Sequence, residues 1–254
     1  MELQSFGFSD VGKRRKHNED SYLCNDKERL YLVADGMGGH ASGETASRIA
    51  INCIEEFVVH SRSGPVSRPV KAQKGLTPEQ NRLYAGTFLA NARILETTKD
   101  YPETNGMGTT LTGLLVEEDH LAVVNVGDSR LYRIRDGELA QVTLDHTYVG
   151  EMVRRGRLTP EEAQKHPQRH ILTNALGIQK NIKIDTFQVD IMGGDLFLIC
   201  SDGLYDMIED NRIGEIIHSN METSLYKAGL SLVLEANLAG GLDNITVVLL
   251  LFKD

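Results

Sequence analysis

Short apolar runs separated by turn-forming residues recur along the chain, and they predict β-strands. The predicted strands are residues 3–9, 20–25, 30–34, 111–116, 121–126, 131–134, 139–142, 185–191, 195–200 and 245–252. The four strands between residues 111 and 142 are separated by turns such as Asp136-Gly137. This regular spacing is typical of an antiparallel meander.

A second periodicity, with apolar residues three and four positions apart, predicts amphipathic helices between the strands. The first helix follows Gly43 and carries an apolar stripe that includes Ala46 and Phe57. The next begins at Thr77-Pro78-Glu79, because threonine caps a helix and proline fits its first turn, and it ends before Pro102. Further helices are predicted at 149–155, from Thr159, at about 211–218 and at about 223–238.

The order of these elements places strands at the start, middle and end of the chain, with two helices early and two late. This order favours an α+β fold in which helices cover the outer faces of antiparallel sheets that pack together. We expect one domain over residues 1–254, because a chain of this length can bury a large core. Residues 60–77 show little periodicity, and we expect them to form a surface connection. Residues 145–180 interrupt the run of strands, and we expect an irregular segment of the kind that is usually functional or mobile.

One carboxylate, Asp35, stands where a buried strand is expected to end. It follows the apolar run 30–34 and precedes Gly36-Met37-Gly38-Gly39, whose glycines allow backbone conformations that end a strand. Four further aspartates take similar places at the ends of predicted strands, and these are Asp20, Asp128, Asp202 and Asp243. Five carboxylates at strand ends predict a metal cluster.

The residue types in this cluster indicate which metal ions it could bind. Carboxylate oxygens suit Mg²⁺, Mn²⁺ or Ca²⁺, whereas zinc sites draw on His and Cys, which are not clustered here. The calcium-loop pattern Asp-x-Asp-x-Asp-Gly is also absent, which leaves Mg²⁺ or Mn²⁺. Two such ions about 4 Å apart can share a carboxylate, activate water and clamp a phosphoryl group. Asp35 is the natural bridge, and Arg15, five residues before Asp20, is the candidate for gripping the phosphate bidentately.

Composition and charge narrow the class of function. The formal net charge of -9 argues against a protein that binds nucleic acid through clustered basic residues. Cys24, Cys53 and Cys200 are an odd set without Cys-x-x-Cys spacing, so we expect reduced thiols rather than a disulfide framework or a thiolate zinc site. The start, Met1-Glu2-Leu3-Gln4, does not read as a signal peptide, and no run approaches the roughly 20 apolar residues of a membrane helix. We therefore expect a cytoplasmic protein that binds neither nucleic acid nor membrane.

Six short motifs occur in an order that covers nearly the whole chain. They are Ser9-Asp10-Val11-Gly12 with Arg15-x-x-Asn18-Glu19-Asp20, Asp35-Gly36-Met37-Gly38-Gly39-His40, Gly106-Met107-Gly108-Thr109-Thr110-Leu111, Val126-Gly127-Asp128-Ser129-Arg130, Ser201-Asp202-Gly203-Leu204 and Asp243-Asn244-Ile245-Thr246. Together they resemble the metal-dependent protein phosphatases of the protein phosphatase 2C family, in its compact bacterial form. Each motif is weak alone, but six in this order are very specific.

The resemblance implies a four-layer α/β/β/α sandwich, with two antiparallel sheets packed face to face and helices on both outer faces. It also implies a protein serine/threonine phosphatase that hydrolyses phosphoserine and phosphothreonine with a metal-activated water. Its partners would be phosphoprotein substrates and a serine/threonine kinase that acts in opposition, and the enzyme would be a monomer. The segment His146–Gly177 matches the family's variable flap, which is a place for substrate choice.

The same resemblance implies roles for individual residues. Asp35 would bridge two core Mn²⁺ or Mg²⁺ ions, the Gly36 carbonyl would complete one site, and Asp202 and Asp243 would hold the other. The remaining implied residues are Glu19 and Asp20, which act largely through bound waters, Asp128, which joins Asp202 around a weaker third ion, and Arg15, which receives the phosphate.

One position departs from the eukaryotic pattern. Eukaryotic members place a histidine directly after the metal-binding Asp-Gly, where it is thought to protonate the leaving group, but Met37 stands there in this chain. The nearest histidine is His40, which is the candidate general acid, against a structural role in the turn. The alternative general acids are a water on the third metal and His146.

Other classes of function fit the sequence less well. A nucleotide-binding loop would need Gly-x-Gly-x-x-Gly or P-loop spacing, which Gly36-x-Gly38-Gly39 lacks. A cysteine-dependent phosphatase needs a cysteine and an arginine with five residues between them, and none of the three cysteines has an arginine at that offset. The remaining alternative is a non-catalytic pseudophosphatase that binds phosphoproteins, although none of the expected ligands is replaced.

Overall fold

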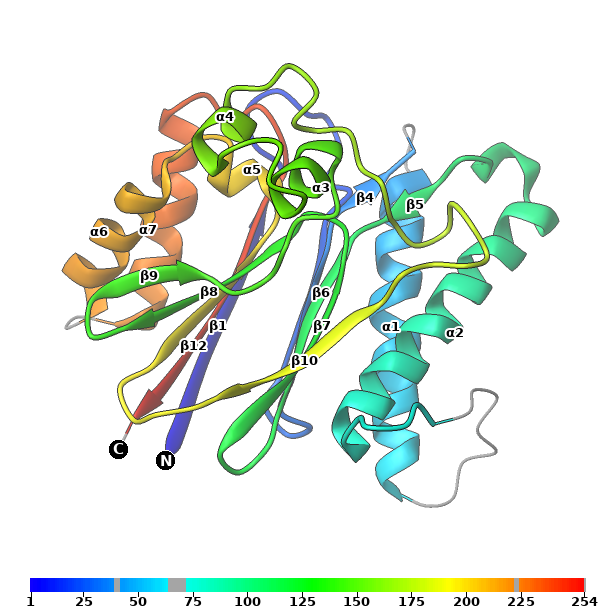
Figure 1. Ribbon diagram of the computed structural model, residues 1–254, viewed down its shortest axis with the longest axis horizontal. Helices are drawn as coiled ribbons and strands as arrows, with labels where there is room; N and C mark the ends of the chain where they lie inside the picture. Colours follow the sequence, from blue (N-terminus) through cyan, green and yellow to red (C-terminus); the bar gives the residue numbers. More distant parts are fainter. Residues whose placement is uncertain (39–41, 64–71, 222–223, 254) are drawn as a thin grey trace.

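Two five-stranded antiparallel sheets stack face to face in the structure, a computed structural model that describes residues 1–38, 42–63, 72–221 and 224–253 (Figure 1). The first sheet contains, in spatial order, β1 (Glu2–Asp10), β12 (Ile245–Lys253), β11 (Leu196–Cys200), β8 (Arg130–Arg135) and β9 (Glu138–Gln141). The second sheet contains β10 (Asp185–Asp190), β7 (His120–Val126), β6 (Leu111–Val116), β3 (Leu30–Ala34) and β2 (Ser21–Asn25). A short ribbon pairs β4 (Gly36–Met37) with β5 (Gly108–Thr109).

Long helices cover the outer face of each sheet, as the family resemblance implied. The pair α6 (Asp210–Met221) and α7 (Leu225–Leu238) packs on the first sheet, and the pair α1 (Ser42–Ser63) and α2 (Pro78–Asp100) packs on the second (Figure 1). The shorter helices are η1 (Pro102–Thr104), α3 (Tyr148–Arg154), α4 (Pro160–Gln164) and α5 (Asp202–Tyr205). The four-layer arrangement is therefore confirmed.

Three apolar cores separate these four layers, and β12 contributes to two of them. Val247 and Leu249 pack toward the helices on the first sheet, whereas Val248 and Leu250 pack toward the second sheet. Successive side chains of a strand point to opposite faces, so a strand in the middle of a sandwich must be apolar at every position. This explains the continuous apolar run at residues 245–252.

Local capping signals in the sequence are present in the structure. At the start of α2 the Thr77 hydroxyl accepts a hydrogen bond from the Gln80 amide, and the Gln80 side chain accepts one from the Thr77 amide. Together these satisfy two of the amide groups that a helix start leaves free. The predicted start of this helix and its end before Pro102 are confirmed.

The predicted antiparallel meander is wrong in one respect. Strands β6 and β7 form a hairpin in the second sheet, whereas β8 and β9 form a hairpin in the first sheet. The chain passes from one sheet to the other through the turn Gly127-Asp128-Ser129. Apolar alternation predicts that a strand exists, but the sheet that it joins depends on long-range packing that the local pattern does not contain.

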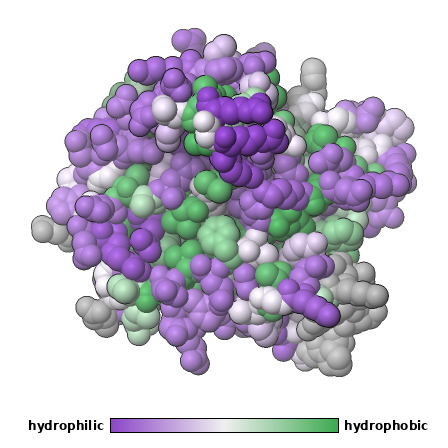
Figure 2. Space-filling model, viewed as in Figure 1, coloured by the Kyte–Doolittle hydropathy of each residue, from purple (hydrophilic) through white to green (hydrophobic). Residues whose placement is uncertain are grey.

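The surface is mostly hydrophilic on the face shown in Figure 2, with apolar side chains gathered near its middle. A cavity of about 400 Å³ lies on the protein surface between Val142, Leu144, Ile184 and Phe187. No helix within the described ranges combines the length and the apolar character that crossing a membrane would need.

Candidate metal centre

The predicted carboxylates come together at one end of the sandwich. Asp35 follows the last residue of β3, which pairs with the first residue of β2, and Asp20 directly precedes β2. Asp202 and Asp243 lie near the adjacent ends of β11 and β12, which also pair. Burial raises the pKa of Asp35 most, and charge repulsion raises it further, which comes from Asp20, Asp202, Asp128 and Asp243. The fold thus gathers the five aspartates that the sequence singled out.

The backbone at Asp35 is fixed by two threonines, Thr109 at the end of β5 and Thr110 between β5 and β6. The Asp35 carbonyl accepts hydrogen bonds from the Thr110 amide at 2.8 Å and the Thr109 hydroxyl at 2.9 Å. The Asp35 amide donates to the Thr110 hydroxyl at 3.0 Å. These contacts explain the Gly-Thr-Thr motif, because they hold the aspartate rigidly where the strand ends.

Asp20 is buried, with 8% of its surface exposed. Its Oδ2 atom accepts hydrogen bonds from the Ser201 hydroxyl at 2.8 Å and the Thr246 hydroxyl at 2.6 Å. Its Oδ1 atom is buried without a hydrogen-bond partner among the described residues. A buried carboxylate oxygen without a partner is costly, so this atom indicates a place for a cation or an ordered water.

Asp202 opens α5 directly after the buried strand β11 and Ser201. The next residue must be glycine, because a Cβ at Gly203 would lie 1.9 Å from the Asn244 carbonyl oxygen. This close approach brings the Asp202 turn against the Asp243-Asn244 turn. The Asp202 Oδ1 atom is also buried without a partner in the described part of the chain.

Glu19 and Gly36 are packed against the first turn of α1. A Cβ at Gly43 would lie 2.9 Å from Glu19 Oε2, and a Cβ at Gly36 would lie 2.2 Å from the Gly43 carbonyl oxygen. The Ser47 hydroxyl donates to the Glu19 carbonyl at 2.6 Å. Two glycines therefore let the start of α1 press on the residues that carry Glu19 and Gly36.

Arg15 lies at the rim of the cluster. Its Nη2 atom forms an ion pair with Asp243 Oδ2 at 2.5 Å, and this hydrogen bond raises the pKa of the guanidinium. The Arg15 side chain is 53% exposed. It is thus a fixed positive charge that borders the carboxylates and also faces solvent.

The electrostatics of the cluster favour a cation. Burial, followed by repulsion from neighbouring aspartates, raises the pKa of Asp35 and Asp202 well above the usual value. Burial raises the pKa of Asp20 to about 6. Carboxylates arranged this closely destabilise one another unless protons or metal ions neutralise them. The all-oxygen donor set and the two unpartnered oxygens fit Mg²⁺ or Mn²⁺.

Asp128 lies in the turn between the two sheets and is 7% exposed. Its carbonyl accepts a hydrogen bond from the Tyr205 hydroxyl at 3.0 Å, and burial raises the pKa of its carboxyl to about 7. A second group of potential metal ligands includes Asp202. The ligand atoms of His170, Asp202 and Asp206 all lie within 4.8 Å of one another. Asp128 is not a member of that set, although Asp202 is.

The two histidines considered as general acids have different outcomes. His40 lies outside the described residues. His146 is 1% exposed, and its ring nitrogens contact Asp185, Gly127 and Asn174. A histidine enclosed in this way does not reach a leaving group, so the structure argues against His146 as the acid.

Sequence reasoning missed the role of Asn244. Its side-chain oxygen accepts a hydrogen bond from the Glu19 amide at 2.8 Å, and its Nδ2 atom donates to the carbonyls of Val11 and His17, both at 3.0 Å. Asn244 thereby ties the loop that carries Arg15 and Glu19 to the start of β12. Its place directly after Asp243 in a motif was the available signal.

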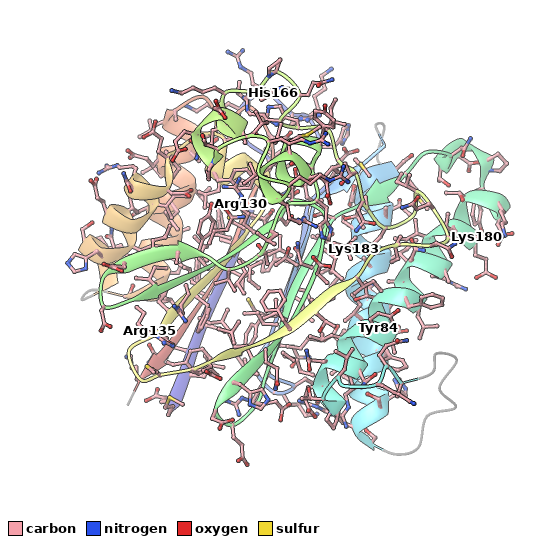
Figure 3. All side chains as sticks on the ribbon, viewed as in Figure 1. Tyr84, Arg130, Arg135, His166, Lys180 and Lys183 are labelled. Atoms are coloured by element: carbon pink, nitrogen blue, oxygen red, sulfur yellow. The ribbon has the colours of Figure 1, made fainter. Side chains whose placement is uncertain are left out.

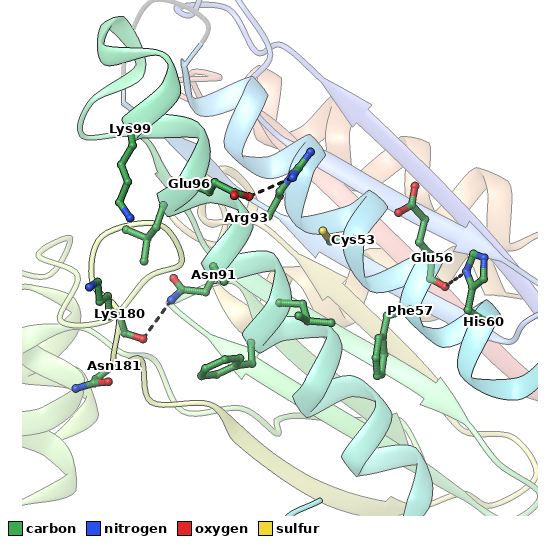
Figure 4. A pocket seen from close by; sticks show the side chains of 14 residues that line it. Cys53, Glu56, Phe57, His60, Asn91, Arg93, Glu96, Lys99, Lys180 and Asn181 are labelled. Carbon is green, nitrogen blue, oxygen red and sulfur yellow. Dashed lines mark hydrogen bonds and ion pairs between the residues drawn. The ribbon is translucent and has the colours of Figure 1, made fainter. Parts of the chain in front are cut away.

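Two cavities differ in their relation to the carboxylates. One of about 650 Å³ lies beneath the flap segment (residues 146–177) and is lined by Asp128, Arg130 and Asp206. Figure 3 labels Arg130 below this segment and His166 on its outer side. The other, of about 780 Å³, lies between α1 and α2 and is lined by none of the predicted site residues (Figure 4). Of these two cavities among the described residues, the first borders the candidate metal centre.

Comparison with known proteins identifies relatives along almost the whole chain. The family model described as protein phosphatase 2C matches residues 12–239. The serine/threonine phosphatase stp of Listeria innocua is 34% identical over 244 residues, which are 95% of this chain and 92% of that protein.

Solved structures agree with the sequence relatives. The serine/threonine phosphatase PstP/Ppp of Mycobacterium tuberculosis superimposes with a TM-score of 0.86 at 36% identity, and the match covers 99% of both chains. The catalytic domain of a serine/threonine protein phosphatase PstP in complex with two manganese ions superimposes with a TM-score of 0.83 at 34% identity, again over 99% of both chains.

Proposed function

The chain belongs to the protein phosphatase 2C family and is a protein serine/threonine phosphatase, and from this premise we propose that Asp35 and the carboxylates around it hold two Mn²⁺ or Mg²⁺ ions. When bound, such a pair activates a water for direct attack on phosphoserine or phosphothreonine and clamps the phosphoryl group. The observation that carries the proposal is the buried carboxylate cluster with unpartnered oxygens on Asp20 and Asp202. The manganese-bound relative supports the choice of metal.

Each proposed ligand would have its own role at the metal centre. Asp35, whose backbone is held by Thr109 and Thr110, would bridge the two ions, and the Gly36 carbonyl would complete one site. Asp202 and Asp243, brought together by the contact between their turns, would hold the other ion. The remaining ligands would be Glu19 and Asp20, which would act largely through bound waters.

A weaker third ion is part of the proposal. Asp128 and Asp202 are its ligands, and His170 and Asp206 lie close enough to Asp202 to supply further donors. This place borders the cavity beneath the flap segment, which we propose as the region of substrate choice.

The proposed partners are phosphoproteins and a serine/threonine kinase that acts in opposition, and the enzyme is proposed to be monomeric. A cytoplasmic location is supported by three free cysteines, because reduced thiols are the rule there. The alternative, a non-catalytic phosphoprotein-binding module, is disfavoured because every expected ligand is present.

The proposal is tested by hydrolysis of a phosphothreonine peptide after chelation and again after adding back Mn²⁺ or Mg²⁺. We expect activity only with metal, and an at least tenfold lower activity for Asp243→Asn at limiting Mn²⁺, because one ligand charge is lost. If the folded, metal-loaded protein hydrolyses no phosphopeptide, the binding-only alternative is correct.

Replacing Arg15 with alanine is expected to raise KM about tenfold while changing kcat less than about threefold, since the guanidinium binds the phosphate before and during reaction. Steady-state kinetics with the same peptide measure this split. Arg14→Ala removes an exposed neighbouring charge and serves as the matched control. A fall in kcat at unchanged KM would contradict a role in phosphate capture.

A further inference from the structure

The His146 side chain joins three segments that are distant in sequence. Its Nδ1 atom lies 3.2 Å from the Gly127 amide nitrogen and 3.0 Å from Asn174 Nδ2, and its Nε2 atom lies 3.0 Å from Asp185 Oδ2. His146 and Asn174 lie near the two ends of the flap segment. These ends run side by side, because Thr147 and Leu172 form an antiparallel bridge, and we call them the base of the flap. The ring therefore contacts both sides of the flap base, the turn before Asp128, and β10.

The hydrogen-bond partners determine which ring nitrogen carries the proton. The Gly127 amide is a donor, so Nδ1 must accept. The orientation of Asn174 is fixed independently, because its Nδ2 atom donates to the Lys183 carbonyl at 2.7 Å and its Oδ1 atom accepts from the Lys183 amide at 3.3 Å. Asn174 thus also presents a donor to Nδ1. The proton is therefore on Nε2, where it is donated to Asp185.

Asp185 is suited to fix this arrangement. The hydrogen bond from His146, followed by contact with Lys183, lowers the pKa of the Asp185 carboxyl to about 2, so this group is an acceptor at neutral pH. Lys183 Nζ lies 3.0 Å from Asp185 Oδ1, and Figure 3 labels Lys183 beside β10. A permanently ionised acceptor on one side of the ring keeps Nδ1 free to accept on the other.

The turn that His146 contacts has little freedom of its own. Gly127 has φ of 105°, and a Cβ at this residue would lie 2.7 Å from Thr110. The His146 amide also donates to the Gly127 carbonyl at 2.9 Å. Both backbone polar groups of Gly127 are thus bound by one residue, and Asp128 is the next residue in the chain.

We propose that His146, as a neutral imidazole protonated on Nε2, is a positioning residue that holds the Gly127-Asp128 turn against the base of the flap segment. It acts through Gly127 on the place of the Asp128 carboxylate, and it transfers no proton in the reaction. This inference rests on the proposed role of Asp128 as a ligand of the third ion.

Two substitutions separate the contacts of the ring. His146→Asn retains an acceptor close to the position of Nδ1 and loses the donor to Asp185. His146→Gln retains a donor close to the position of Nε2 and loses the acceptor for Gly127. Lys183→Ala removes the ammonium group from Asp185 without touching the ring, and it is the matched control.

The first readout is hydrogen exchange of the Gly127 amide by NMR in the Mg²⁺-loaded protein. We expect exchange to be about tenfold faster in His146→Gln, because the Gly127 amide loses its hydrogen bond to the ring. In His146→Asn and Lys183→Ala, which keep an acceptor for this amide, we expect exchange to be less than about threefold faster. A residue that served only to fill space would give the opposite order, since glutamine is the larger side chain. Equal acceleration in both His146 variants, or none in either, overturns the proposal.

The unmodified protein provides a test that does not depend on a variant folding. The ¹⁵N resonances of the His146 ring at neutral pH are expected to be those of a protonated Nε2 and an unprotonated Nδ1. A protonated Nδ1 overturns the proposal.

Failure of the third-ion role is recognised separately. Asp128→Asn and His146→Gln are each expected to raise the Mn²⁺ concentration for half-maximal activity about tenfold, with little change in the KM for peptide. If Asp128→Asn leaves this concentration unchanged, Asp128 is not a ligand of a third ion. The amide exchange and the ring ¹⁵N measurements then still decide whether His146 holds Gly127 in place. If only Asp128→Asn raises it, His146 does not act on Asp128.

Discussion

Replacing Asp35 with asparagine is expected to lower kcat for a phosphothreonine peptide by at least about 10³-fold, which corresponds to about 4 kcal/mol of lost transition-state stabilisation. An amide carries no charge and cannot bridge two cations as a carboxylate does. The backbone bonds to Thr109 and Thr110 do not involve the substituted group, so the fold is expected to persist. Initial rates at saturating Mn²⁺ measure the loss.

Stability measurements distinguish this loss from unfolding. Because Asp35 is repelled by Asp20 and other aspartates in the metal-free protein, Asp35→Asn is expected to raise the Tm of the chelated protein at pH 7.5. Asp190→Asn, at the exposed last residue of β10, removes the same charge away from the cluster and is the control. Near-native activity of Asp35→Asn with Mn²⁺ present would refute the two-metal assignment.

The second large effect is on stability: the chelated protein is expected to lose stability as pH rises from 5 to 8. The pKa of Asp20 is raised to about 6 and that of Asp128 to about 7, while an aspartate in the unfolded chain titrates near 3.9. Between these values the folded state holds protons that the unfolded state has released, so the free energy of unfolding falls with rising pH. Once the pH has passed about 7, the pKa of Asp128, both groups become charged, and the loss that they cause levels off toward pH 8.

The two groups together account for a loss of about 4 kcal/mol, or roughly 8–16 °C in Tm for a chain of this size. Thermal unfolding in the presence of a chelator, followed across this pH range, measures the effect. Mn²⁺ is expected to restore the Tm at pH 8 because it replaces the missing protons. A Tm of the chelated protein that rises with pH would show that the carboxylates are not held against one another.

Much of the secondary structure could be predicted from local sequence. The capped start of α2 at Thr77 and the fully apolar strand β12 follow from hydrogen-bonding and burial rules that act over a few residues. The short elements β4, β5 and α5 were not predicted, because two to four residues carry too little periodicity to be recognised. Strands β4 and β5 exist only because they pair with each other, and α5 lies against Asn244, so each depends on a segment that is distant in sequence.

The candidate site could be predicted only as a set of residue types. The place of Asp35, Asp128 and Asp202 directly after apolar runs indicated carboxylates at strand ends, and the motif order indicated the family. The hydrogen bonds of Asn244 and the enclosure of His146 could not be inferred, because each depends on segments more than 15 residues away along the chain. For the same reason, His146 remained an alternative general acid until its neighbours were known.

The sequence by itself determined the elements, the acidic donor set and the family, because propensity, capping and motif spacing are local properties of the chain. Only the tertiary structure decided that β6–β7 and β8–β9 belong to different sheets, and that the turn between them holds Asp128 beside Asp202. The physical reason is that sheet membership and carboxylate clustering arise from burial and repulsion between distant segments. Those interactions form only when the two sheets and the helices that cover them pack together.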